Sequence, residues 1–296
     1  MSDAGKIIYA KCLLFGEHIT LRGAQALATP LRSYSGQWVL APDNTDYPYR
    51  ESLREFAATL PETHFDRASF LTDLERGLLF ESSIPTGYGA GSSGALVAAT
   101  AHRYGRRLPT DVLELRNLLA RAESHFHGSS SGTDPLICYL ERPILIDPEQ
   151  GIQIIDLSPL DNMQWYLLDT GTTRRTGPWV ELFLKKFDHE RIFREQCERL
   201  LFPASNGAIE ALRAGLGSVL FELFHEISQF QQRYFAEFIP EELHDLWLTG
   251  LSGNEFRLKL CGAGGGGFML ALVRTECAQS FQAKVASTWS ISRFMN

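Results

Sequence analysis

Residues 85–94 of the chain read Pro85-Thr86-Gly87-Tyr88-Gly89-Ala90-Gly91-Ser92-Ser93-Gly94, and an apolar segment follows from Ala95. Glycines at alternate positions let a backbone turn tightly and approach a ligand closely. The apolar segment is typical of a helix, and a helix N-terminus presents unpaired N–H groups and the positive end of its dipole. The stretch therefore predicts an anion-binding loop, of the kind that holds phosphate, at the start of a helix over residues 92–104.

Two adjacent hydroxyl groups, Ser92 and Ser93, follow the last alternate glycine of this loop. We expect both in the first turn of the helix, where a hydroxyl can cap the helix or donate to a phosphate oxygen. Oxygen ligands are also those that Mg²⁺ prefers, so either serine could ligate a magnesium ion. Helix capping, phosphate binding and metal binding are all open for this pair.

The loop fits two common nucleotide-binding patterns only in part. Residues 89–94 match the dinucleotide pattern G-x-G-x-x-G, but about twenty residues later a second helix opens at Pro109, where that pattern places a strand ending in an acid. A Walker-type loop would end in G-K-S or G-K-T, and no lysine follows these glycines. A bound nucleotide would therefore be held by another architecture, and a nicotinamide-dependent oxidoreductase is kept as an alternative.

Composition narrows the class of protein. With 296 residues and 44% hydrophobic content, the chain can form one large domain or two smaller ones, and we expect two. A net charge of -7 argues against a general nucleic-acid or membrane-binding surface. Five cysteines without close paired spacing argue against a disulfide framework or a zinc site. With no long apolar segment, the chain is expected to be cytoplasmic. As a separate expectation, the protein is a monomer or a homodimer.

Hydrophobic patterns outline the rest of the chain. Residues 70–80 are expected to form a helix that leads into a short strand. Early strands, central helices and late strands predict an α+β chain with a boundary near residue 160. Strand-like runs occupy residues 6–15, 26–31, 153–155, 165–169, 256–260 and 268–273, and helical patterns follow Pro109 and occupy about 180–248.

Three further features place charge or glycine where structure alone does not require it. Glu123 lies at the edge of an apolar helical stripe, an unfavourable position for a carboxylate unless a positive group is close. A turn of small residues begins at His127 and ends in the acid Asp134. Residues 262–267 read Gly-Ala-Gly-Gly-Gly-Gly between two strand-like runs, which is more glycine than a hairpin needs.

Three separated motifs stand in a fixed order along the chain: Lys11 with residues 16–18 (Gly-Glu-His), the loop that ends at Ser93, and the glycine loop 262–267. In this order the chain resembles the GHMP small-molecule kinases over most of its length. Within that family the resemblance is greatest to the mevalonate kinases. Residues 11–18 are similar to their first motif, and residues 127–134 are similar to their H-G-x-x-S-G-x-D segment.

The resemblance implies a fold and an activity. The fold would be α+β, the two-domain GHMP kinase fold, with a ribosomal protein S5 domain 2-like ATP-binding domain over residues 1–160 and a ferredoxin-like domain over 161–296. The activity would be ATP- and Mg²⁺-dependent phosphorylation of a small-molecule alcohol, with mevalonate converted to 5-phosphomevalonate in isoprenoid biosynthesis. Phosphomevalonate, a sugar or homoserine are alternative acceptors. A nucleotide-binding sensor is a further alternative, although a sensor has no need of the acid Asp134.

The resemblance also assigns roles to residues. Asp134 would be the catalytic carboxylate beside the substrate hydroxyl, and Lys11 would neutralise charge on the transferred phosphoryl group. Ser93 and Glu123 would be the magnesium ligands. The nucleotide-binding residues would be Gly87, Gly89, Gly91, Ser92, Ser93, Gly264, Gly265 and Gly266, and the acceptor-binding residues Glu17, His18, Arg174 and Thr176.

Two departures from the family pattern bear on these roles. Tyr9 and Ala10 precede Lys11, where the family usually has Pro-Gly. Ser130 replaces a common proline in the segment that ends at Asp134. The second departure loosens the assignment of the substrate more than the assignment of a kinase.

Overall fold

The computed structural model describes residues 5–41, 47–173 and 176–295. Contacts divide the chain into two compact units. The first unit consists of Met1–Lys11, Pro30–Pro85 and Ala90–Arg142, and the second of Cys12–Thr29, Thr86–Gly89 and Pro143–Asn296. Each unit is therefore assembled from separated segments. The predicted domain boundary near residue 160 stays a prediction.

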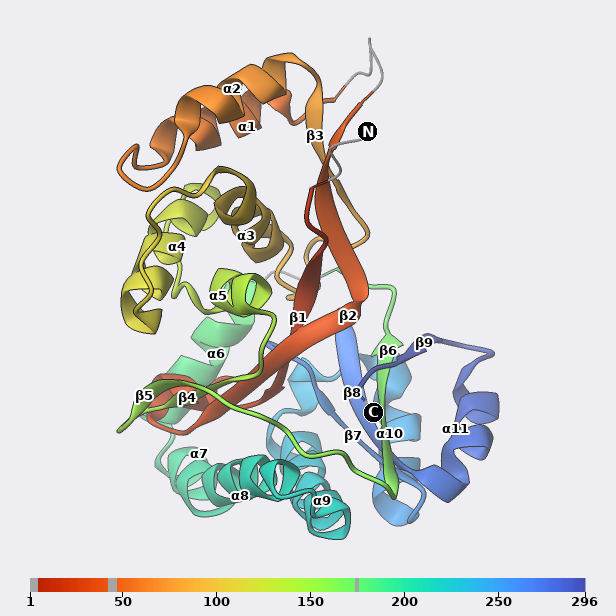
Figure 1. The fold of residues 1–296 in the computed structure, drawn as a ribbon. Helices are drawn as coiled ribbons and strands as arrows, with labels where there is room; N and C mark the ends of the chain where they lie inside the picture. The colour runs from red at the N-terminus through yellow and green to blue at the C-terminus, as the bar shows by residue number, and fades with distance from the viewer. Residues whose placement is uncertain (1–4, 42–46, 174–175, 296) are drawn as a thin grey trace. The chain divides into compact units, whose positions relative to one another are not determined.

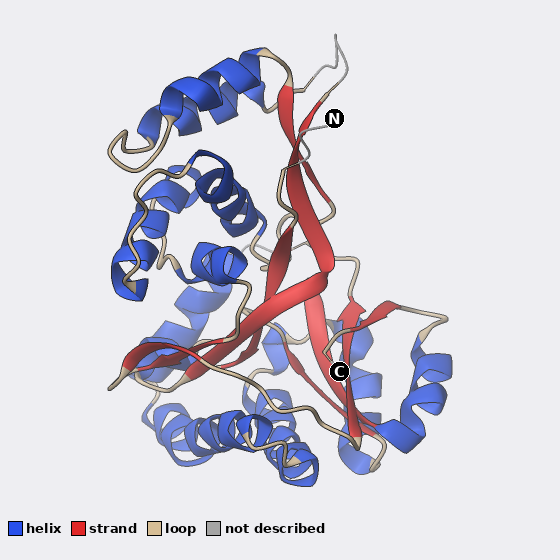
Figure 2. Ribbon diagram, in the orientation of Figure 1, coloured by secondary structure: helices blue, strands red, loops and turns tan. Residues whose placement is uncertain are grey.

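Two long strands, β1 (Ile8–Phe15) and β2 (Ala26–Leu40), contribute residues to both units. Within the first unit, the end of β2 pairs antiparallel with β3 (Leu78–Ser82). Figure 2 shows the helices of this unit on one side of these strands. The helices are α1 (Arg50–Thr59), α2 (Arg67–Glu75), α3 (Ser92–Tyr104), α4 (Val112–His127) and α5 (Thr133–Leu140).

Aromatic side chains form the core of the first unit. Phe70 is fully buried, with its ring centroid 5.3 Å from that of Trp38 and 6.3 Å from that of Phe56. The ring of Tyr104, at the end of α3, stacks on Phe70 at 4.6 Å. Aromatic pairs at such distances stabilise a core beyond the effect of area burial alone. This core joins α1, α2 and α3 to β2.

Helix α4 illustrates how the local sequence positions the site. The carboxylate of Asp111 accepts a hydrogen bond of 2.9 Å from the N–H of Glu114, which caps the helix at its start. Leucines and alanine at helical spacing then turn one face inward, and Glu123 continues that buried face with 5% of its surface exposed. The sequence placed Glu123 partly toward the interior, and this is confirmed.

The second unit contains the remaining strands (Figure 1). The start of β2 pairs antiparallel with β4 (Ile144–Asp147), which pairs with β5 (Gly151–Ile154). A separate four-stranded antiparallel sheet has the order β7-β8-β6-β9. Its strands are β6 (Met163–Asp169), β7 (Phe256–Leu260), β8 (Phe268–Arg274) and β9 (Ser290–Arg293).

Helices cover this sheet, and α9 and α10 both pack against β7. Every residue of β7 is buried, which is typical of a strand covered on both faces. The helices are α6 (Thr176–His189), α7 (Arg191–Gln196), α8 (Phe202–Arg213), α9 (Gly217–Tyr234), α10 (His244–Ser252) and α11 (Ala278–Val285). Shorter turns are 3₁₀-helices at Ile19–Arg22, Ala236–Phe238, Glu241–Leu243 and Thr275–Cys277 and a π-helix at Cys197–Leu201.

The α+β class and most predicted elements are confirmed. Helix α3 spans residues 92–104 as predicted, and the helical pattern of residues 180–248 corresponds to α6 through α10. Strand β2 runs to Leu40, well beyond the predicted end at residue 31. Polar residues such as Ser33 and Ser35 weaken the pattern there, and the pairing with β3 holds the strand together. Over the described residues, no helix combines the length and apolarity needed to span a bilayer.

Candidate active site

The glycine loop before α3 has the backbone that its sequence predicts. Gly87, Gly89 and Gly91 all have positive φ angles, of 81°, 70° and 77°. Such angles are strained for residues with a side chain, so glycine is required at these positions. Gly91 is the N-cap of α3, and no side chain caps the helix. Of the roles open to the serines that follow, capping is therefore not observed, and the helix N-terminus is suited to an anion.

Lys11 and Asp134 meet in the first unit. Lys11 lies on β1, and its backbone N–H donates to the carbonyl of Ala90 in the glycine loop at 3.0 Å. Its Nζ lies 3.0 Å from Oδ1 of Asp134. Asp134 stands in the first turn of α5, where the helix dipole favours a carboxylate. Its side chain is 35% exposed and that of Lys11 only 11%. A held cation thus adjoins an acid that a small molecule can reach.

Two glycines let α3 and its loop lie directly on this pair. A Cβ atom on Gly91 would come within 2.8 Å of Cγ of Lys11 and 3.7 Å of Oδ2 of Asp134. A Cβ atom on Gly94 would lie 2.9 Å from the backbone carbonyl carbon of Asp134. The distances of 2.8 Å and 2.9 Å are shorter than ordinary van der Waals contact. The absence of side chains here therefore lets the end of the glycine loop and the start of α3 lie against the Lys11–Asp134 pair.

Glu123 is held by hydroxyl groups rather than by a cation. Ser93 Oγ donates to Glu123 Oε1 at 2.8 Å, and Ser130 Oγ donates to Glu123 Oε2. Nε2 of His127 lies 3.0 Å from Ser93 Oγ. Burial raises the pKa of Glu123 above its usual range, and the negative charge of Asp134 raises it further. The positive group expected beside this carboxylate is thus replaced by hydroxyl donors among its described contacts.

The Ser93–Glu123 pair fits a magnesium ion by its chemistry. Mg²⁺ prefers oxygen ligands and is commonly held by one or two carboxylates together with substrate phosphates. Within the described ranges, no group of three or more His, Cys, Asp and Glu residues could hold a metal by itself. The hydroxyl of Ser93, at the start of α3, and the carboxylate of Glu123, on α4, match the chemistry of a metal that is bound together with phosphate.

In the second unit, Glu17 forms a buried ion pair with Lys259 of β7. The side chains of Lys259 and Glu17 are 0% and 4% exposed. Nζ of Lys259 also donates to the carbonyl of Leu260 at 2.7 Å, and the N–H of Gly262 donates to the Glu17 carboxylate. Burial raises the pKa of Glu17, and the charge of Lys259 opposes this rise. The pair therefore holds the end of the first motif against the start of the glycine loop 262–267.

His18 makes a second connection to the same loop. Its Nε2 lies 3.1 Å from the carbonyl oxygen of Ala263. The imidazole stacks on Phe183 at 5.1 Å and meets the rings of Phe235 and Phe238 edge-on. The residue is 6% exposed. The acceptor-binding role expected for His18 and Glu17 stays a prediction, because both side chains are engaged within the unit.

Glycine is required in the loop 262–267 for steric reasons. Gly264 and Gly265 have φ angles of 82° and 74°. A Cβ on Gly264 would lie 2.8 Å from Cβ of Phe238, and one on Gly265 would lie 2.1 Å from Nε1 of Trp179. The N–H of Gly265 donates to the carbonyl of Phe238 at 2.6 Å. The predicted loop is thus shaped by α6 and by the turn after α9.

Two predicted acceptor-site residues have side chains that the structure does not describe, and two residues of the site were not predicted from the sequence. Arg174 lies outside the described residues, and Thr176 begins α6 with its side chain also outside them. Sequence reasoning missed Lys259 and Trp179. The signal for Lys259 was present in the sequence. Residues 256–260 read Phe-Arg-Leu-Lys-Leu, and a lysine between two leucines of a strand-like run implies a buried partner for its charge.

The structure argues against the dinucleotide-binding alternative. Helix α3 is followed by α4 and not by a strand, so the dinucleotide-binding alternative lacks its βαβ unit.

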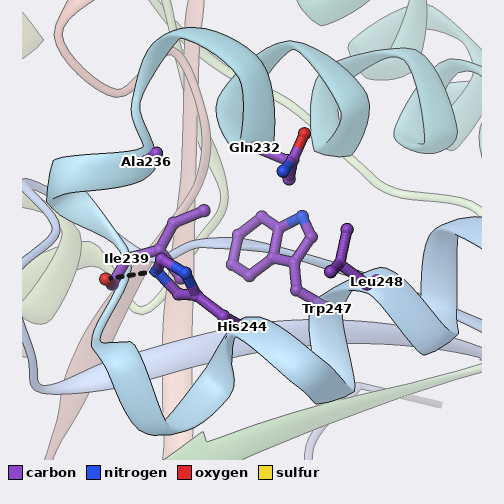
Figure 3. Close-up of a pocket in the computed structure, with 6 residues that line it drawn as sticks. All are labelled: Gln232, Ala236, Ile239, His244, Trp247 and Leu248. Carbon is purple, nitrogen blue, oxygen red and sulfur yellow. Dashed lines mark hydrogen bonds between the residues drawn. The ribbon is translucent and has the colours of Figure 1, made fainter.

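A small cavity in the second unit, shown in Figure 3, measures about 30 Å³, which is room for water. None of the motif residues lines it. The lining residues are Gln232, Ala236, Ile239, His244, Trp247 and Leu248.

Comparison with known proteins gives matches along the chain. Residues 54–142 match the family model of the GHMP kinases N terminal domain. The chain is 27% identical over 215 residues to a mevalonate kinase of Aeropyrum pernix. This alignment covers 71% of the chain and 65% of that protein, so the chain spans just under two thirds of the relative's length.

Solved structures share the fold over nearly the full chain. L. major mevalonate kinase in complex with R-mevalonate has a TM-score of 0.67 at 19% identity, covering 99% of this chain and 94% of that one. Lactococcus lactis galactokinase complexed with galactose has a TM-score of 0.67 at 16% identity, covering 99% and 93%. Streptococcus pneumoniae phosphomevalonate kinase in complex with phosphomevalonate and AMPPNP has 0.67 at 17%, covering 98% and 99%. At these identities the likeness establishes the fold alone.

Proposed function

We propose that this chain, which belongs to the GHMP kinase family, transfers the terminal phosphoryl group of ATP to the hydroxyl group of a small molecule. The observation that carries the proposal is the ion pair of Lys11 and Asp134, with Nζ and Oδ1 3.0 Å apart, directly under the glycine loop of α3. Phosphoryl transfer requires mainly alignment and positive charge around the transferred group. A held cation beside an accessible acid meets both needs.

Each member of the pair has a distinct task in this proposal. The Asp134 carboxylate accepts the proton of the acceptor hydroxyl. As it does so, the hydroxyl oxygen bonds to the terminal phosphorus of ATP, and the bond from that phosphorus to the ADP oxygen breaks. Lys11 stays protonated and offsets negative charge on the transferred group. A positioned base contributes about 10²–10⁴ in rate, and charge stabilisation in a preorganised site contributes further.

The nucleotide is assigned to the anion-binding elements. The uncapped N-terminus of α3, with Gly91, Ser92 and Ser93, offers backbone N–H groups to phosphate oxygens. Gly87 and Gly89, and the loop residues 264–266 of the second unit, are given the same task. Ser93 and Glu123 would hold magnesium, which supplies positive charge to the phosphate oxygens when bound.

Mevalonate is the proposed acceptor. Support comes from the segment 127–134, which is similar to that of mevalonate kinases, and from the sequence match to a mevalonate kinase of Aeropyrum pernix. Glu17, His18, Arg174 and Thr176 are kept as proposed acceptor-site residues. Turnover of mevalonate would give 5-phosphomevalonate.

A substrate panel tests the proposal. Purified protein with MgATP should release ADP in a coupled assay when mevalonate is added, and more slowly or not at all with phosphomevalonate, galactose or homoserine. If one of the other alcohols is turned over instead of mevalonate, the proposed kinase activity stands but the proposed acceptor is wrong. Stabilisation by MgATP in a thermal shift, without ADP release from any alcohol, would favour the sensor instead.

Gly91→Ala should lower kcat/KM by more than its effect on stability explains. The new Cβ would displace Lys11 from Asp134, and a misplacement near 1 Å can cost on the order of 10²-fold in kcat/KM. The left-handed backbone at Gly91 adds a stability cost of about 1–2 kcal/mol. Gly151→Ala is the matched control, because Gly151 has a φ of 78° and no atom within 4 Å of its added Cβ. Equal kcat/KM for the two variants would contradict the packing argument.

A further inference from the structure

Ser130 stands where the family commonly has a proline, and its hydroxyl makes two contacts that proline cannot make. Its Oγ donates to Oε2 of Glu123. The same oxygen accepts a hydrogen bond of 2.9 Å from the N–H of Gly132. One side chain thus closes the turn that leads to Asp134 and at the same time contacts the carboxylate of α4.

The two oxygens of Glu123 have different partners. Oε1 accepts from Ser93 Oγ at 2.8 Å, and Oε2 accepts from Ser130. The residue is 5% exposed, so water is a poor substitute for either donor. Leaving a buried acceptor without its donor is unfavourable, and more so when the acceptor is charged. The contact with Ser130 therefore restricts rotation of the carboxylate and keeps Oε1 beside Ser93.

We propose that Ser130 is a positioning residue for the magnesium ligands: it holds Oε2 of Glu123 so that Oε1 and the Ser93 hydroxyl face a common point. This inference rests on the proposed function, in which Ser93 and Glu123 hold the metal. Groups that hydrogen-bond a metal ligand typically change metal affinity by about 10–100-fold when they are removed. Ser130 would supply in this chain a hydrogen bond that a proline at the same place could not donate.

Three variants test the role of the hydroxyl. Ser130→Ala removes it, and Ser130→Thr retains it as the conservative rescue. Ser124→Ala is the matched control, because Ser124 lies beside Glu123 on α4 but its hydroxyl donates to the backbone carbonyl of Ala120 at 2.7 Å. Mn²⁺ serves as the probe because it shares the preference of Mg²⁺ for oxygen ligands and is visible by electron paramagnetic resonance.

Two affinities are measured for each full-length protein: that of Mn²⁺ for the protein–ADP complex, and that of ADP in the presence of EDTA by calorimetry. Ser130→Ala should weaken Mn²⁺ binding by about 10–100-fold, with metal-free ADP affinity unchanged. Ser130→Thr and Ser124→Ala should bind Mn²⁺ as the wild type does. A purely structural role for Ser130 would instead weaken both affinities of the alanine variant together.

The outcomes distinguish the two levels of the argument. If the wild type binds Mn²⁺ with ADP and transfers phosphate, but Ser130→Ala binds Mn²⁺ equally tightly, the positioning role is overturned and the kinase stands. Loss of metal-free ADP binding in step with Mn²⁺ binding would also overturn it. If the wild type neither binds Mn²⁺ with ADP nor releases ADP from ATP with any alcohol, the proposed function itself fails.

Discussion

Replacing Asp134 with asparagine is expected to lower kcat by about 10²–10⁴ while the affinity for ATP stays unchanged. Asparagine keeps the size of the side chain but cannot accept the proton of the acceptor hydroxyl. Its neutral amide also leaves the charge of Lys11, 3.0 Å away in the wild type, without its carboxylate partner. Steady-state kinetics give kcat, and calorimetric titration with a non-hydrolysable ATP analogue gives the nucleotide affinity.

Asp161→Asn is a suitable control for this measurement, because Asp161 is exposed in the turn before β6 and belongs to none of the proposed machinery. It should retain wild-type kcat. A fully active Asp134→Asn enzyme would remove Asp134 from proton transfer. A variant that has lost ATP binding together with kcat would instead indicate that Asp134 supports the nucleotide site.

Replacing Lys259 with methionine is expected to lower the free energy of unfolding by about 3–5 kcal/mol. The side chain of Lys259 is 0% exposed and its partner Glu17 only 4%, so the substitution leaves a buried carboxylate without its counter-charge. The whole free energy of unfolding of a native domain is commonly only about 5–15 kcal/mol, so the expected loss is large. Urea denaturation followed by circular dichroism measures it.

The pH dependence and a double variant identify the cause. Without Lys259, burial is the largest influence on the pKa of Glu17 and raises it in the folded state above its unfolded value, against backbone hydrogen bonds such as that from Gly262, which lower it. The folded state then binds the proton more tightly, so the deficit should shrink as the pH falls from 8 to 5. Glu17→Gln combined with Lys259→Met removes both charges and should recover most of the loss. A deficit in Lys259→Met that does not vary with pH would argue that lost packing, including the contact of Nζ over the Phe15 ring at 5.5 Å, is responsible.

Prediction from sequence succeeded where the signal is local. Helix α3 spans the predicted residues, since glycine, serine and an apolar run mark a helix start within a few positions. It was less successful where a distant partner completes an element. The far half of β2 and the short strand β9 are stabilised by pairing with β3 and β6, and neither is apparent from its own residues. Strand propensity depends strongly on such neighbours.

The site divides in the same way. The resemblance of the ordered motifs to those of the GHMP kinases was enough to nominate Lys11, Ser93, Glu123 and Asp134 as site residues. That Nζ of Lys11 lies on the Asp134 carboxylate, that Ser130 binds Glu123, and that Lys259 neutralises Glu17 depend on side chains from different elements. These contacts arise only when helices and strands pack, because burial makes each polar group find a donor or counter-charge in three dimensions. The sequence alone thus identified which residues are candidates for the site, and only the tertiary structure decided which side chains are their partners.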